Sequence, residues 1–133
     1  MLHPGHIRLL EQARALGDVL VVGVRGDAAA RAMRGGASGR DKAPLRPILP
    51  ASERAEILAG FAAVELVVIF ESREPEELLV QLQPDVIVKG APQIAVASVT
   101  KSVSGGAESI VCIPREPGYS STRLIERIQQ LRA

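Results

Sequence analysis

Short apolar runs alternate with amphipathic segments along most of this chain, and this alternation constrains the fold most strongly. The run Val19–Val24 contains only aliphatic residues and one glycine, as expected of a parallel strand that is covered on both faces. Further strands are predicted at Glu65–Phe70, Asp85–Val88 and Ser109–Pro114. Strands that alternate with helices indicate βα units with right-handed crossovers. We therefore expect a single α/β domain over residues 1–133, built on a doubly wound parallel sheet.

Helices are predicted where apolar residues recur at helical spacing or where turn residues mark the ends of a segment. The predicted helices cover residues 5–16, 27–33, 52–60, 75–83, 93–103 and 120–131. The segment 34–50 is rich in glycine, proline and basic residues and is expected to be a long loop. Loops of this length inside a compact domain are often functional.

Composition argues against several classes of partner. The 16 Lys and Arg residues nearly balance the 15 Asp and Glu residues, so the chain lacks the charge of a nucleic-acid-binding protein. Only 2% of residues are aromatic, which leaves little for stacking on bases. No apolar stretch reaches the roughly 18 residues that a membrane span needs, and we expect a cytoplasmic protein without membrane contact. The single cysteine, Cys112, lies in an apolar run and is expected to be a small buried hydrophobe.

The sequence Met1-Leu2-His3-Pro4-Gly5-His6 stands where the first helix begins. The unpaired N–H groups and the positive dipole end of a helix favour an anion there. Two imidazoles add donors that can carry positive charge, which predicts a polyphosphate site. A helix-capping turn with two solvated imidazoles is the simpler alternative. Phosphate-binding turns of this kind normally follow a buried strand, so we expect the first strand of the sheet to be missing.

Other polar residues follow the predicted strands, where ligands gather in an open parallel sheet. Asp27, Lys89 and Ser120–Thr122 occupy such positions. Each has a simpler alternative role: Lys89 as an exposed lysine and Ser120–Thr122 as a helix N-cap. The sequence contains neither a Gly-x-Ser-x-Gly turn nor a Cys–His signature, which favours direct phosphoryl or nucleotidyl transfer over covalent catalysis.

Basic residues in the predicted loop 34–50 form a further candidate set. These residues are Arg40, Lys42 and Arg46. They are either solvated charges or part of a lid that closes over phosphates.

This ordered set of motifs resembles the cytidylyltransferase-like nucleotidyltransferases, also known as the HxGH family. The heptose-phosphate adenylyltransferases are most similar, followed by the glycerol-3-phosphate cytidylyltransferases. The resemblance covers nearly the whole chain and implies a Rossmann-like fold. Leu2–Asp18 is similar to the signature helix of the family, Val86–Gly90 to its lysine strand and Gly118–Ile125 to its C-terminal Ser/Thr signature. Arg46–Ile48 with Glu53–Leu58 is similar to its central segment.

The resemblance also implies an activity and a set of site residues. The implied reaction is transfer of a nucleotidyl group, AMP from ATP, to a sugar phosphate such as a heptose 1-phosphate, with Mg²⁺ and release of pyrophosphate. The implied catalytic residues are His3, His6 and Lys89. The implied nucleotide-binding residues are His3, Gly5, His6, Arg54, Ser120, Ser121 and Thr122, and the implied substrate-binding residues are Asp27, Lys42 and Arg46. No residue is expected to be a metal ligand.

The chain departs from the family pattern in ways that predict structural consequences. The family places a central strand before the histidine motif, so without it two neighbouring strands would be unpaired and the core open. Exposed sheet edges favour association with another chain, and a homodimer is expected. Arg25-Gly26-Asp27 and Ala91-Pro92 differ from the usual residues, as does the loop 34–46, and these changes bear on substrate choice. Two other functions stay open: a CTP-dependent polyol-phosphate cytidylyltransferase and a catalytically silent nucleotide-binding module.

Overall fold

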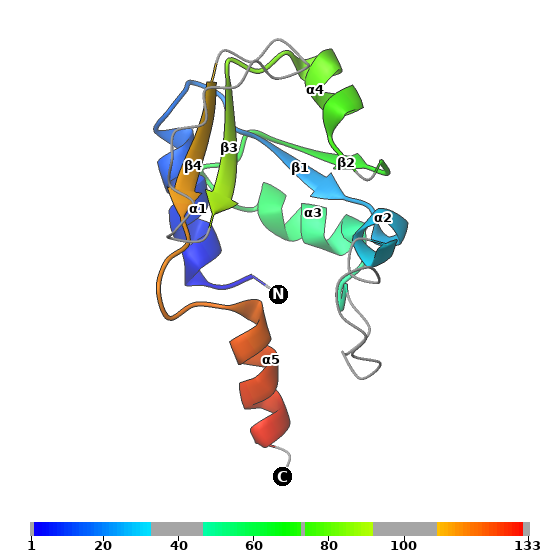
Figure 1. The fold of residues 1–133 in the computed structure, drawn as a ribbon, viewed down its shortest axis with the longest axis vertical. Coiled ribbons are helices and arrows are strands. Elements are labelled where there is room, and N and C mark those ends of the chain that lie inside the picture. Colours follow the sequence, from blue (N-terminus) through cyan, green and yellow to red (C-terminus); the bar gives the residue numbers. More distant parts are fainter. Residues whose placement is uncertain (1, 33–46, 73, 92–108, 132–133) are drawn as a thin grey trace.

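The computed structural model describes residues 2–32, 47–72, 74–91 and 109–131 (Figure 1). The elements in chain order are α1 (Pro4–Arg14), β1 (Val21–Arg25), α2 (Asp27–Ala32), α3 (Ala51–Ala59), β2 (Leu66–Phe70), α4 (Glu76–Leu82), β3 (Val86–Ala91), β4 (Ser109–Pro114) and α5 (Ser121–Gln130). The predicted helix over 93–103 and the candidate lid residues Arg40, Lys42 and Arg46 lie outside the described residues. No helix in the described ranges combines the length and the hydropathy of a membrane span.

Local sequence signals explain where the helices begin and end. Pro4 stands in the first turn of α1, where its missing N–H has no helical partner to lose. The Oγ of Ser120 accepts hydrogen bonds from the backbone N–H groups of Thr122 and Arg123 at 3.2 and 3.4 Å, so Ser120 caps α5. The predicted capping role of Ser120 is therefore confirmed.

β3 is longer than predicted, and this corrects the position of Lys89. The strand runs through Ala91, so Lys89 and Gly90 lie within it and do not follow it. The reason is pairing with β4, whose register continues from Val86↔Ser109 to Ala91↔Pro114. The apolar run of β4 is long enough to pair with every residue of β3.

The strands form two separate parallel pairs. β1 pairs with β2, and β3 pairs with β4, both in the predicted parallel orientation. In the part of the chain that the structure describes, no strand joins the two pairs into one sheet. Each described strand has one parallel partner, and the loss of pairing around a missing strand stays a prediction.

The helices cover the two sheets unequally. α3 packs against β1 and β2, whereas α1 lies beside the β3–β4 pair, and α5 begins near the start of α1 and projects away from the sheets (Figure 1). Buried side chains are small or medium-sized, namely Ala13, Val24, Ala29, Ala51, Ala91, Ile113 and Ile125. None of the large side chains among the described residues is fully buried, as expected of an open core. Cys112 is half-buried, a correction to the predicted burial, because it pairs with the exposed Lys89 across the β3–β4 ladder.

Candidate active site

The first turns of α1 and α5 meet at a cavity of about 380 Å³. The histidine motif supplies one side of this cavity and the Ser/Thr segment supplies the other. The lining residues at this meeting point include His3, Gly5, His6, Ser120, Ser121 and Thr122. The structure therefore brings together six of the predicted nucleotide-binding residues, which come from two groups more than 100 positions apart in the sequence.

The two histidines form a compact pair at the start of α1. The backbone N–H of His3 donates a hydrogen bond to Nδ1 of His6 at 3.3 Å, and the two imidazole centroids are 3.9 Å apart. When His6 is neutral, this contact places its proton on Nε2, where it can be donated to a ligand.

Burial is the main reason that the pKa of each imidazole lies below its ordinary value, and proximity to His3 lowers the pKa of His6 further. Both imidazoles are therefore mainly neutral at neutral pH. They can act as hydrogen-bond donors to a phosphate without a permanent charge.

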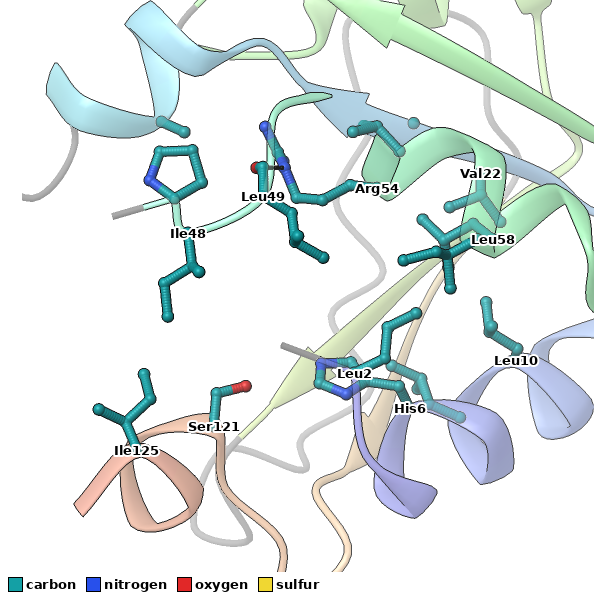
Figure 2. Close-up of a pocket in the computed structure, with 16 residues that line it drawn as sticks. Leu2, His6, Leu10, Val22, Ile48, Leu49, Arg54, Leu58, Ser121 and Ile125 are labelled. Atoms are coloured by element: carbon teal, nitrogen blue, oxygen red, sulfur yellow. Dashed lines mark hydrogen bonds between the residues drawn. The ribbon is translucent and has the colours of Figure 1, made fainter. Parts of the chain in front are cut away.

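A second cavity, of about 440 Å³, adjoins the first and shares His6, Leu9 and Ser121 with it. Its walls are mostly aliphatic side chains from α1, β1, α3 and α5. Figure 2 shows His6 on α1 and Ser121 at the start of α5 on one side of this cavity, with Ile48, Leu49 and Arg54 across it. The first cavity, lined by the histidines and the Ser/Thr segment, is the polar cavity, and the second, lined mainly by aliphatic side chains, is the apolar cavity.

Arg54 of α3 forms hydrogen bonds with three other segments near the second cavity. Its Nε donates to the carbonyl of Leu49 at 3.1 Å, and its Nη2 donates to the carbonyl of Arg25 at 2.9 Å and to Oδ1 of Asp27 at 2.7 Å. These contacts connect α3, the end of β1 and the start of α2. The predicted ligand-binding residues Arg54 and Asp27 thus bind each other, and their contacts with nucleotide or substrate stay predictions.

This ion pair predicts an acid-dependent loss of stability. The hydrogen bond from Arg54 holds the pKa of Asp27 below its ordinary value. A carboxylate with a lowered folded-state pKa stabilises the fold above its unfolded-state pKa, and this contribution disappears as the pH falls through the folded-state value. We therefore expect Asp27→Asn to lower the free energy of unfolding at neutral pH, and to have a shrinking effect below about pH 4.

Urea unfolding at a series of pH values measures this effect. Asp18→Asn changes an exposed carboxylate outside the Arg54 ion pair and serves as the control. An Asp27→Asn effect that stays constant from neutral to acidic pH would contradict the assignment.

Lys89 is not brought to the histidines. Its side chain is exposed, and it is absent from the described linings of the two cavities. Side chains alternate between the two faces of a strand, and a Cβ on neighbouring Gly90 would lie 3.3 Å from Leu9 of α1. Lys89 therefore points to the sheet face opposite α1. Its catalytic role stays a prediction.

Several residues at the polar cavity were missed in the sequence. Arg8 and Gln12 line it from α1, and Arg115, Glu116 and Tyr119 line it from the segment before α5. A signal for two of them was present, because Arg8 and Gln12 are three and seven positions after Gly5 and so share its helical face. The segment before α5 carries no comparable periodic pattern.

Comparison with known proteins then decides the family. The family model described as "Cytidylyltransferase-like" matches residues 1–127. The chain belongs to the cytidylyltransferase-like family. This finding confirms the resemblance seen in the histidine and Ser/Thr motifs.

Relatives within the cytidylyltransferase-like family match nearly the whole chain. The "Bifunctional protein HldE" of Koribacter versatilis (strain Ellin345) is 43% identical over 129 residues, which cover 96% of this chain and 25% of that protein. The proteins of the same name from Acidiphilium cryptum (strain JF-5) and Helicobacter pylori (strain Shi470) are 40% and 38% identical, and the matches cover 97% and 98% of this chain. The chain spans about a quarter of the length of these relatives.

Proposed function

We propose that this chain transfers a nucleotidyl group, AMP from ATP, to a sugar phosphate such as a heptose 1-phosphate and releases pyrophosphate. The observation that carries the proposal is the meeting of His3, His6 and the first turn of α5 at one cavity. Two helix N-termini and two imidazole donors suit a ligand with several phosphate groups. ATP and the sugar phosphate are chosen from the motif resemblance to heptose-phosphate adenylyltransferases.

The proposed reaction is a single in-line displacement. A phosphate oxygen of the sugar phosphate attacks the α-phosphorus of the nucleotide, and a new P–O bond forms. The bond between the α-phosphorus and the oxygen that bridges to the β-phosphorus breaks, and its electron pair leaves with pyrophosphate. Because the attacking group is already an anion, the protein's work is to position both substrates and to stabilise the developing charge.

The location of each residue suggests its role in binding the substrates or stabilising charge. The Nε2–H of His6 and the imidazole of His3 would donate hydrogen bonds to the phosphate oxygens on which charge develops. Ser121 and Thr122 would hold the β- and γ-phosphates at the positive end of the α5 dipole. The apolar cavity that adjoins His6 and Ser121 would take the less polar part of the bound nucleotide.

Mg²⁺ is proposed only as a companion of the triphosphate, whose charge it would partly neutralise. Among the described residues that line the polar cavity, the carboxylate is that of Glu116, and it is paired with Arg8. No group of three or more His, Cys, Asp or Glu side chains in the described ranges could hold a metal ion. This donor set does not match the carboxylate oxygens that Mg²⁺ prefers, and we assign no residue to the metal.

Pyrophosphate release tests the proposal directly. The purified chain is incubated with Mg²⁺, each nucleoside triphosphate in turn, and a panel of sugar and polyol phosphates. We expect the fastest release with ATP and a heptose 1-phosphate. A preference for CTP with a polyol phosphate would instead identify a cytidylyltransferase.

Calorimetry separates the remaining alternative. A chain that binds nucleotide but releases no pyrophosphate with any pair of substrates would be a catalytically silent nucleotide-binding module. A chain that neither binds nucleotide nor turns it over would overturn the proposed site as well as the proposed reaction.

A further inference from the structure

Tyr119 connects the starts of the two helices that form the polar cavity. Its ring is stacked against the imidazole of His3, with centroids 6.1 Å apart and an interplanar angle of 20°. The His3 ring in turn contacts the His6 ring. An aromatic pair at this separation is attractive beyond the area it buries. Through its contact with His3, the side chain of Tyr119 therefore connects the segment before α5 to the histidine pair of α1.

Arg8 holds Tyr119 from the α1 side. Its guanidinium carbon lies 5.4 Å from the centroid of the Tyr119 ring, within the range of a cation–π contact. The same guanidinium forms an ion pair with the carboxylate of Glu116. Arg8 thus contacts the segment before α5 at two points.

A glycine turn precedes Tyr119 and a helix cap follows it. Gly118 has a φ of 85°, in the left-handed region that favours glycine, and this turn directs the chain into Tyr119. Ser120, the next residue, is the N-cap of α5. A shift of Tyr119 would therefore be transmitted directly to the first turn of α5.

Helix packing contributes little to this connection. Within the described part of the chain, α1 and α5 share no extensive contact, and α5 extends away from α1 (Figure 1). The short segment that includes Glu116 and Tyr119 therefore contributes to the relative placement of the two helix N-termini.

We propose that Tyr119 is a positioning residue: its ring, held by Arg8, fixes the His3 imidazole and the first turn of α5 at the spacing that a polyphosphate ligand requires. This inference rests on the proposed function, because it assigns Tyr119 a role at the same site. Tyr119 acts through His3 and α5 and need not contact the reacting atoms.

Binding of inorganic pyrophosphate tests the inference without turnover. We expect Tyr119→Ala to weaken pyrophosphate binding, measured by calorimetry, by about ten- to hundredfold, because misplaced contacts lose much of their effect. Tyr119→Phe keeps the ring and should bind within about twofold of the unmodified chain. Equal binding by Tyr119→Ala and the unmodified chain, or a loss in Tyr119→Phe as large as in Tyr119→Ala, would overturn the inference.

The titration of His3 provides a readout that a general loss of stability would not move. Burial lowers the pKa of His3, and the positive charge of the N-terminal amino group lowers it further. The other charged or titratable groups that line the same cavity are His6 and Arg8 of α1 and Arg115, Glu116 and Tyr119 of the segment before α5. Tyr119→Ala should expose the ring to water and raise its pKa toward the ordinary value, as followed by NMR of the imidazole. Tyr119→Phe should leave the titration unchanged. An unchanged His3 titration in Tyr119→Ala would overturn the inference.

Arg8→Ala tests the same connection if Tyr119→Ala does not fold. The Arg8 side chain is 48% exposed, so its removal leaves no buried cavity. We expect weaker pyrophosphate binding, whereas Arg14→Ala at the other end of α1 should bind normally. Equal binding by Arg8→Ala and Arg14→Ala would show that the contacts of Arg8 with Tyr119 and Glu116 do not position the site. Normal pyrophosphate binding without any nucleotidyl transfer in the unmodified chain would overturn the proposed reaction and leave the inference about Tyr119 standing.

Discussion

His6→Ala should reduce kcat for pyrophosphate release by about 10²- to 10³-fold, the usual effect of removing one preorganised donor at a site of developing charge. His6 lines both cavities, and its Nδ1 is already occupied by the backbone N–H of His3, which leaves Nε2 for the ligand. Alanine removes this donor and opens space that water can enter. Initial rates with saturating ATP and sugar phosphate measure the loss.

Stability measurements distinguish a catalytic loss from unfolding. The hydrogen bond that His6→Ala removes is long, at 3.3 Å, so the free energy of unfolding should fall by no more than about 1 kcal/mol. Glu11→Ala changes an exposed residue of the same helix that lies outside the described cavity linings, and it should keep full activity. Normal turnover by a folded His6→Ala variant would show that His6 is not part of the catalytic machinery.

Local patterns in the sequence predicted the described helices and strands, whereas the predicted helix over 93–103 stays untested. The bounds of α1, β4 and α5 lie within two residues of the predictions, because capping residues and β-branched runs act on the neighbouring backbone. The histidine motif and the Ser/Thr segment were also predicted to converge, and the structure places both at one cavity.

The remaining features depend on contacts between distant residues. The end of β3, and with it the direction of Lys89, is set by the pairing of Ala91 with Pro114. The contact of Arg8 with Glu116 joins residues 108 positions apart. Neither contact leaves a periodic signal in the sequence, because each depends on the register and placement of whole elements.

Gly5→Ala should reduce activity while leaving the free energy of unfolding nearly unchanged. A Cβ on Gly5 would lie 3.1 Å from Cε1 and Nδ1 of the His3 ring and 3.2 Å from Cβ of Tyr119. These distances are shorter than ordinary van der Waals contacts, so both neighbours must move. The helix itself favours the change, since alanine is better than glycine in a helix by about 1 kcal/mol.

The close contacts of the added Cβ destabilise the fold, whereas the helix propensity of alanine stabilises it, so the two effects oppose each other in the free energy of unfolding. The helix propensity does not offset the effect of the close contacts on the rate. We expect the unfolding free energy of Gly5→Ala to stay within about 1 kcal/mol of the original value. In contrast, kcat/KM should fall by about ten- to hundredfold, because His3 and the start of α5 are pushed apart. Gly17→Ala is the matched control, since a Cβ there meets nothing within 4 Å, and it should change neither quantity. A fully active Gly5→Ala variant would mean that the spacing between His3 and Tyr119 does not limit the reaction.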